Sequence, residues 1–145
     1  MKLWQILTPV GLAAALGFGW MLHRAQALPQ GPVPIVWDQE ACAHCRMHVG
    51  EPGFAAQAQL EDGTILNFDD PGCLLSWSGE PHPKVHAIYL HHHREDRWLV
   101  PEAAGFVPAQ PTPMGFGLAV VDKTSSTAIG WDEAQKQVRR RRGGS

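Results

Sequence analysis

The chain has 145 residues, of which 44% are hydrophobic and 18% are charged. This length and composition are typical of one globular domain and exclude a wholly disordered chain, a collagen-like chain and a coiled coil. The formal net charge of −2 does not indicate a general nucleic-acid binder, so no nucleic-acid partner is expected. Three cysteines are too few, and an odd number, for a disulfide scaffold.

The first 27 residues are predicted to form an N-terminal transmembrane anchor or a signal segment. Residues 3–22 carry no charge over 20 positions, which matches the length that a helix needs to cross a bilayer. The alternative is a cleaved signal peptide, because Ala25-Gln26-Ala27 has the small-x-small form of a cleavage site. Both interpretations export the rest of the chain. We therefore expect a bacterial inner-membrane protein with a single N-terminal span and its domain in the periplasm, or a periplasmic protein after cleavage near Ala27.

Three further segments complete the predicted organisation. Residues 28–34 are rich in proline and glycine and are predicted to be a semi-extended linker. Residues 35–138 form the predicted globular domain. Residues 139–145 begin with four arginines and are predicted to be a basic disordered tail. Since the whole chain carries −2, the chain without these four arginines carries −6.

The first half of the domain predicts the order strand, turn, strand, helix. Residues 54–60 and 64–68 have strand-like patterns, and Asp62-Gly63 between them is a hairpin signal. A short helix over residues 71–77 should follow, with Asp70 as its N-cap and a proline at its first position.

The second half repeats a similar order of elements, without a strict sequence repeat. Its predicted strands cover residues 85–90, 98–100, 104–107 and 117–122, and its predicted helix covers residues 132–140. The expected fold class is therefore α+β, with two small ββαβ-like halves after the N-terminal helix, rather than a parallel βαβ sheet.

Side chains that can bind metals are densest in residues 41–48, which read ACAHCRMH. Thiolate and thioether ligands select Cu(I), whereas thiolate and imidazole also suit Zn(II). The C-x-x-C spacing of Cys42 and Cys45 lets one turn present both sulfurs to one ion. If Cys45 and Met47 lie in extended backbone, their side chains point to the same face. His44 is a further donor in the same segment.

A second methionine, Met114, lies between Pro113 and Gly115 and is expected in a rigid loop. Its ordinary explanation is that a methionine fills a gap in the core. Beside the sulfur-rich segment, however, Met114 adds a second thioether to a potential Cu(I) site.

Three other interpretations of the pair Cys42 and Cys45 remain open: a structural zinc site, a thioredoxin-type redox pair, and a structural disulfide or two buried thiols. A zinc ribbon needs a second C-x-x-C or a histidine pair at fixed spacing, and no second C-x-x-C exists. A thioredoxin-type pair is expected after a strand of a βαβ unit, but here the linker lies just upstream. Copper is favoured because the nearby Met47 adds little to zinc or redox chemistry.

Other chemically active side chains have structural explanations. A helix N-cap accounts for at least one of Asp69 and Asp70. Cys73 lies on the short helix and can face the C-x-x-C pair, but a buried core cysteine is the commoner case. Residues 91–93 are all histidines and are expected in a solvated loop. Because no Ser-His-Asp order, phosphate-binding glycine loop or H-E-x-x-H motif is present, no enzyme is predicted.

Taken together, these motifs resemble the NosL family of accessory copper proteins for nitrous oxide reductase maturation. The matching stretches are Cys45-Arg46-Met47, residues 55–77 (AAQAQLEDGTILNFDDPGCLLSW) and Thr112-Pro113-Met114-Gly115. The resemblance covers residues 37–138. It implies an α+β fold of two small ββαβ-like halves and the binding of monovalent copper in the periplasm. It also implies Cys45, Met47 and Met114 as the metal ligands.

Two features depart from the family's pattern. Most members are lipoproteins, whereas this chain has no lipobox cysteine. The family commonly has glycine between the cysteine and the methionine, and here Arg46 stands in that place. A positive side chain there is expected to lower the pKa of the Cys45 thiol and to favour metal binding near neutral pH.

The predicted function is therefore that of a membrane-tethered periplasmic Cu(I)-binding accessory protein. Its expected metal ligands are Cys45, Met47 and Met114, with Cys42 and His44 as further donors. Its expected partners are a copper-enzyme client or its membrane assembly complex, and the inner membrane through residues 3–22. The alternatives are a thiol–disulfide oxidoreductase that uses Cys42 and Cys45, and an interaction domain with a structural zinc.

Overall fold

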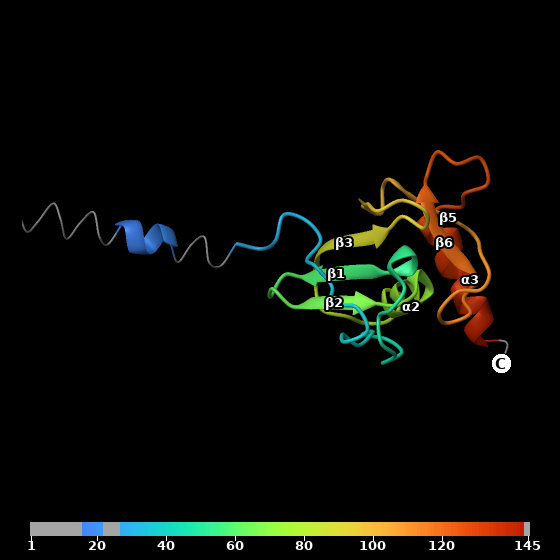
Figure 1. The fold of residues 1–145 in the computed structure, drawn as a ribbon, viewed down its shortest axis with the longest axis horizontal. Coiled ribbons are helices and arrows are strands. Elements are labelled where there is room, and N and C mark those ends of the chain that lie inside the picture. Colours follow the sequence, from blue (N-terminus) through green and yellow to red (C-terminus); the bar gives the residue numbers. More distant parts are fainter. Residues whose placement is uncertain (1–15, 22–26, 144–145) are drawn as a thin grey trace, which may run out of the picture. The chain divides into compact units, whose positions relative to one another are not determined.

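The computed structural model describes residues 16–21 and 27–143 (Figure 1). The chain divides into two compact units, Met1–Gln30 and Gly31–Ser145. In the first unit, residues 16–21 are helical and expose apolar side chains such as Leu16 and Phe18. In the part of the chain that is described, no helix has the length and apolarity that a membrane span requires. Most of the predicted anchor lies outside the described residues, so the span and the cleavage near Ala27 stay predictions.

The second unit begins with a four-stranded antiparallel sheet in the order β2-β1-β3-β4. Its strands are β1 (Ala56–Leu60), β2 (Ile65–Phe68), β3 (Val85–His91) and β4 (Trp98–Leu99). A short 3-10 helix, η1 (Pro52–Phe54), precedes β1, so this strand begins later than the sequence indicates. The turn between β1 and β2 is the predicted hairpin, and Gly63 there has a φ of 88°, which glycine adopts without strain.

The helix α2 (Pro71–Trp77) follows β2 as predicted. The Asp70 carboxylate accepts a hydrogen bond from the backbone N–H of Gly72 at 2.7 Å, which confirms Asp70 as the N-cap. All residues of α2 except Trp77 are buried. In Figure 1, α2 lies between the sheet and the C-terminal helix, and it contacts β1, β2, the later strand β6 (Leu118–Asp122) and that helix. Its side chains therefore form the centre of the core.

The remaining elements are a two-stranded antiparallel sheet and a helix. They are β5 (Ala104–Pro108), β6 (Leu118–Asp122) and α3 (Trp131–Gly143), which packs against α2 and β5. The α+β class is confirmed. The elements β1, β2, α2 and β3 follow the predicted ββαβ order, but the second half differs. There β4 pairs with β3 in the first sheet, and β5, β6 and α3 form a ββα unit with no strand after α3 among the described residues.

The basic C-terminal segment is also different from the prediction of a disordered tail. Residues 139–143 continue α3, which begins at Trp131 rather than after it. The buried side chain of Val138 fixes this part of the helix to the core. Arg139 donates to Gln135 and Arg140 donates to Glu133 on the same helix. Cations at a helix C-terminus also interact favourably with the helix dipole, which helps to extend α3.

Two buried glutamines of β1 fix part of the predicted linker to the sheet. The Gln57 side chain donates to the carbonyl of Val33 at 2.9 Å and accepts from its N–H at 2.8 Å. The Gln59 side chain donates to the carbonyl of Gly31 at 2.8 Å. Residues 31–33 are therefore held on the sheet, rather than forming part of a free spacer.

The same buried amides continue toward the segment that carries the first two cysteines. Gln57 donates to the side-chain oxygen of Asn67 at 2.8 Å, and the Asn67 amide donates to the Glu40 carboxylate. Glu40 in turn accepts the N–H of Val36 at 2.8 Å. Because buried polar groups are costly unless they are paired, this network fixes the chain up to residue 40 in one position on the sheet.

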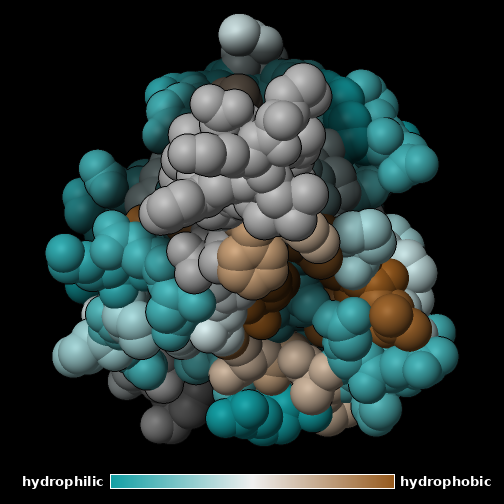
Figure 2. Space-filling model, turned by 90° about the vertical axis from the view of Figure 1, so that its left-hand side faces the viewer, coloured by the Kyte–Doolittle hydropathy of each residue, from teal (hydrophilic) through white to brown (hydrophobic). Residues whose placement is uncertain are grey.

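Large apolar side chains are exposed at few places in the second unit. On the face drawn in Figure 2, hydrophilic side chains make up most of the coloured surface and hydrophobic ones form smaller patches. Among the described residues of this unit, the exposed large hydrophobic side chains are Val36, Met47, Val100 and Met114. Two of these four are the thioethers that the sequence analysis predicts as metal ligands.

The glutamine network gives a first testable prediction. Replacing Gln57 by leucine leaves Val33 and Asn67 without their buried partners, so the free energy of unfolding should fall by about 1–3 kcal/mol. The matched control is Gln39→Leu at an exposed position, which should change it by less than about 0.5 kcal/mol. Urea unfolding followed by tryptophan fluorescence measures both values. Equal stability of the two variants would contradict the role of the network.

Candidate metal centre

The first two cysteines lie on a compact hairpin-like segment, residues 38–49, which we name the cysteine loop. Its two arms are joined by backbone hydrogen bonds, from Val49 to Glu40 at 2.9 Å and from Cys42 to the carbonyl of Met47 at 2.7 Å. Near its tip, the Ala43 N–H donates to the Asn67 carbonyl at 2.8 Å. The loop is therefore fixed to β2 next to the start of α2.

The tip of the cysteine loop is a turn over residues 43–45, followed by a left-handed residue. Arg46 has a φ of 68°, and its N–H donates to the Cys42 carbonyl at 3.0 Å. The condition under which Cys45 and Met47 would point to the same face, extended backbone through Arg46, is therefore not met. The left-handed region costs a residue other than glycine roughly 1–2 kcal/mol. This conformation gives a physical reason for the glycine that the NosL family commonly has at this position.

Three thiols converge beneath this turn. The sulfur atoms of Cys42, Cys45 and Cys73 all lie within 4.8 Å of one another, and all three cysteines are free. Cys42 and Cys73 are fully buried, and Cys45 is half-buried. No disulfide joins Cys42 and Cys45. Cys73, expected as an ordinary core cysteine, faces the C-x-x-C pair from the first turn of α2. The N-cap Asp70 three residues earlier indicates only that Cys73 lies in the first turn of α2.

The thiols influence one another's ionisation strongly. The pKa of Cys42 is lowered from its ordinary value to about 4, chiefly because the Cys73 thiol donates a hydrogen bond to its sulfur. Backbone N–H groups of Cys45, Asp69 and His44 add to this effect. The pKa of Cys73 is raised, first because its proton is held in the bond to Cys42 and then because it is buried.

The pKa of Cys45 is raised as well, and the first cause is its burial. The charge on Cys42 also raises it. The pKa of Cys45 is therefore not lowered as expected from Arg46, because the loss of water around the sulfur and the charge on Cys42 both raise it. In the metal-free protein, the cluster thus holds one negative charge, on Cys42.

Two buried carboxylates connect the cysteine loop, α2 and the loop of Met114. Asp69 accepts the N–H of Gly50 at 3.1 Å. Asp70 accepts the N–H of Met114 at 3.1 Å with its second oxygen, while its first oxygen caps α2. Burial raises the pKa of both carboxyls. Their roles are therefore structural, as the sequence analysis expects.

Met114 lies in a tight turn beside the start of α2. The backbone N–H of Gly115 donates to the Thr112 carbonyl at 3.1 Å. The ring of Phe116 packs closely against Gly72, because a Cβ atom on Gly72 would lie only 2.1 Å from that ring. Gly72 directly precedes Cys73, so the turn and the thiol cluster meet at one end of α2. Met114 is 37% exposed.

The other two predicted donors are arranged differently. Met47 is 57% exposed. Its backbone N–H donates to the sulfur of Cys45, and this hydrogen bond partly offsets the rise in the pKa of that thiol. His44 is half-buried, and its backbone N–H, rather than its ring, acts on Cys42. Its imidazole belongs to neither of the groups of three donors found among the described residues.

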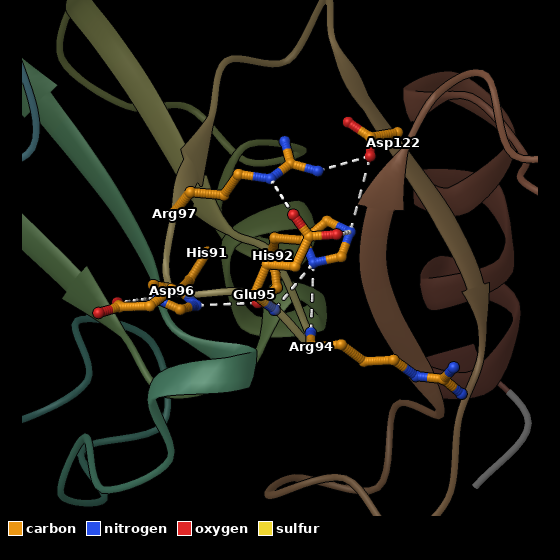
Figure 3. Close-up of polar contacts among 7 residues, drawn as sticks. All are labelled: His91, His92, Arg94, Glu95, Asp96, Arg97 and Asp122. Carbon is orange, nitrogen blue, oxygen red and sulfur yellow. Dashed lines mark hydrogen bonds and ion pairs between the residues drawn. The ribbon is translucent and has the colours of Figure 1, made fainter.

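The second group of three donors consists of His92, Glu95 and Asp122 (Figure 3). Arg97 lies between the two carboxylates and donates to Glu95 at 2.6 Å and to Asp122 at 2.5 Å. This hydrogen bonding lowers the pKa of both carboxyls. A guanidinium therefore already pairs with both of the acidic side chains that a cation would need.

The histidine of this group is also oriented against metal binding. His92 Nδ1 accepts the backbone N–H groups of Arg94 at 3.3 Å and of Glu95 at 3.1 Å, so it carries no proton (Figure 3). The proton then lies on Nε2, which faces Asp122 at 3.8 Å and Glu95 at 3.9 Å. A protonated nitrogen cannot bind a metal, so we interpret this group as a structural ion-pair network.

The histidine run does not form the solvated loop that we expected. His91 ends β3, and both His91 and His92 are buried. His91 contacts the ring of Trp98 edge-on, with a centroid distance of 5.1 Å. His91 is ordered because β3 extends one residue beyond its predicted end, so that His91 pairs with Trp98 of β4.

The fold and the three converging thiols define a class of protein, a small α+β domain whose sulfur cluster is compatible with binding a soft metal. The model of the NosL family matches residues 32–134, and the chain belongs to this family. Membership indicates a copper-binding accessory protein rather than a catalytic enzyme. No curated protein and no solved structure matches the chain.

The left-handed Arg46 gives a prediction about stability. Arg46→Gly and Arg46→Ala both remove the charge, but only glycine relieves the backbone. The glycine variant should therefore be more stable than the alanine variant by about 1 kcal/mol. Chemical denaturation of the two variants side by side measures this difference. If the alanine variant were equally stable, the cost assigned to this conformation would be wrong.

The thiol cluster gives a prediction about proton titration. In the metal-free, reduced chain, one thiolate should persist from neutral pH down to about pH 4, because the pKa of Cys42 is lowered to that value. Ultraviolet absorbance of the thiolate should show this step, and Cys42→Ser should abolish it. Cys73→Ala removes the main hydrogen bond to Cys42 and should move the step to higher pH. An unchanged step in Cys73→Ala would mean that the two sulfurs do not interact as described.

Proposed function

We propose that this protein is a membrane-tethered periplasmic metallochaperone that binds Cu(I) and delivers it for the maturation of nitrous oxide reductase or a related copper enzyme. The observation that carries the proposal is the convergence of three free thiols on one point, in a chain of the NosL family. Client, membrane tether and periplasmic location are parts of the proposal that rest on the sequence and on the family.

The electrostatics of the cluster suit a soft monovalent cation. With one negative charge on Cys42, the raised pKa values of Cys45 and Cys73 keep these two thiols protonated. Bound Cu(I) would offset the repulsion between thiolates, so that further thiols could release their protons and bind. Thiolate ligands also stabilise copper in the monovalent state.

The exposed thioethers suit the release of the metal. Met47 and Met114 are partly open to solvent, whereas Cys42 and Cys73 are fully buried. We propose that the thiols hold Cu(I) inside and that the two methionines bind it at the surface, with His44 as a further donor. A ligand of the acceptor could then replace one protein ligand at a time, so that copper is never released into water.

The lowered pKa of Cys42 is the observation that favours the alternative of a thiol–disulfide oxidoreductase. An attacking thiolate must reach its substrate, however, and Cys42 is fully buried. The structural zinc alternative requires a fourth ligand beside the three thiols, and His44 is the nearest candidate in sequence. Neither alternative gives a role to Met47 or Met114.

The test is an anaerobic titration of the reduced full-length chain with Cu(I) against a colorimetric chelator. The wild type should bind one Cu(I) tightly, and Cys45→Ser and Cys73→Ser should each weaken binding by at least about tenfold, or about 1.4 kcal/mol. Met114→Leu should weaken binding less and leave the fold intact. Met21→Leu, a matched substitution outside the domain, should have no effect.

Proton release separates the possible ligand sets. Since Cys42 is already ionised at neutral pH, a site of three thiolates should release about two protons per Cu(I), and a site with one further thiolate about one. Calorimetry in two buffers of different ionisation enthalpy measures this number. If the wild type fails to compete with the chelator, the proposed function is wrong, and the redox and zinc alternatives come first.

A further inference from the structure

We infer that the surface around Met47 and Met114 is a docking site for an acidic protein that accepts the copper. This inference rests on the proposed copper-carrier function and adds the kind of partner. It is carried by Arg46 on the cysteine loop and by the arginines at the C-terminal end of α3, which is bonded to the loop of Met114.

Both methionine-bearing loops meet at the start of α2. On one side, Cys45 of the cysteine loop has its sulfur within 4.8 Å of the Cys73 sulfur. On the other side, the N–H of Met114 is bonded to the N-cap Asp70 at 3.1 Å. Because Asp70 and Cys73 lie at the same end of α2, the backbone of Met114 and the sulfur of Cys45, next but one to Met47, are held near one another.

Arg46 supplies a positive charge on the cysteine loop. It stands between Cys45 and Met47, is exposed, and its guanidinium makes no hydrogen bond or ion pair within the described part of the chain. Its left-handed backbone costs roughly 1–2 kcal/mol, which glycine would avoid. No contact within the described part of the chain uses this charge, so it is available to a partner. The exposed acidic residue of this loop, Asp38, lies at its base and not at its tip.

The C-terminal end of α3 supplies the second positive group. Arg141 donates to the carbonyl of Gly115, next to Met114, at 3.2 Å, and its guanidinium covers Gly117. Arg139 and Arg140 are exposed at the same end of the helix, where Arg139 is bonded to the uncharged Gln135 and Arg140 is paired with Glu133. From the sequence, α3 has five basic and two acidic residues, a net charge of +3, whereas the rest of the chain carries −5. The basic end of α3 therefore contrasts with an otherwise acidic protein.

The position of these charges favours a protein over a lipid surface. Copper passes by ligand exchange only when the acceptor brings its own ligand to Met47 or Met114. A partner with carboxylates around its copper ligand would pair with the arginines and bring the two metal sites together. A bilayer bound to the same arginines would instead cover the thioethers.

The experiment measures transfer of Cu(I) from the loaded full-length chain to two synthetic peptides. Both peptides carry the same three methionines, flanked by glutamates in one and by lysines in the other. The site variant is R46Q/R139Q/R140Q, and the control is K84Q/R94Q/K123Q, which removes three exposed charges elsewhere. Arg141 is left unchanged because it holds the Met114 turn. Stopped-flow rates are recorded at low and at high salt.

At low salt, the wild type should transfer copper to the glutamate peptide on the order of tenfold faster than to the lysine peptide. The site variant should lose this preference, and the control variant should keep it. High salt should remove the preference from the wild type and from the control variant. The equilibrium affinity for Cu(I) should be the same in all three proteins.

Three results would overturn the inference. They are the absence of a charge preference in the wild type, an equal loss in the control variant, and arginine-dependent binding to phosphatidylglycerol vesicles without any effect on transfer. If the wild type holds Cu(I) but shows no preference, the docking site alone is wrong. If it does not hold Cu(I) at all, the proposed function itself fails.

Discussion

Three sulfur atoms within 4.8 Å of one another, two of them fully buried, cannot all be negatively charged without a cation. The protein accommodates them by placing one charge on Cys42, where the Cys73 thiol and backbone N–H groups stabilise it. The other two thiols keep their protons because burial and the first charge raise their pKa values. The metal-free cluster is therefore stable, yet a soft cation can replace its remaining protons.

Two side chains at the end of β2 and the start of α2 assemble this cluster. Asn67 holds the cysteine loop through its carbonyl and reaches Gln57 and Glu40 with its amide. Asp70 caps α2, which carries Cys73, and also binds the N–H of Met114. Segments separated by many residues thus meet at one point, and the buried amides and carboxylates fix their positions before any metal binds. Preorganisation of this kind lowers the entropic cost of binding.

Local sequence signals predicted the local structure well. Asp62-Gly63 marked the hairpin, and Asp70 marked the start of α2, because each acts through its own backbone neighbours. The C-x-x-C spacing was enough to place Cys42 and Cys45 in one turn. The meeting of Cys73 with this pair could not be derived, since it depends on how the cysteine loop docks on β2. For the same reason the predicted second half was wrong: two of its strands, β3 and β4, pair within the first sheet, because strand partners are chosen by tertiary packing.

The central claim is that the buried thiols form the inner ligands of a Cu(I) site. X-ray absorption spectroscopy of the Cu(I)-loaded full-length chain tests it most directly. The account predicts monovalent copper in a shell made mainly of sulfur atoms, whose number or distance changes when Cys73 is replaced by serine. A shell that contains nitrogen or oxygen and does not respond to the loss of Cys73 would contradict the account, because the metal would then lie outside the thiol cluster.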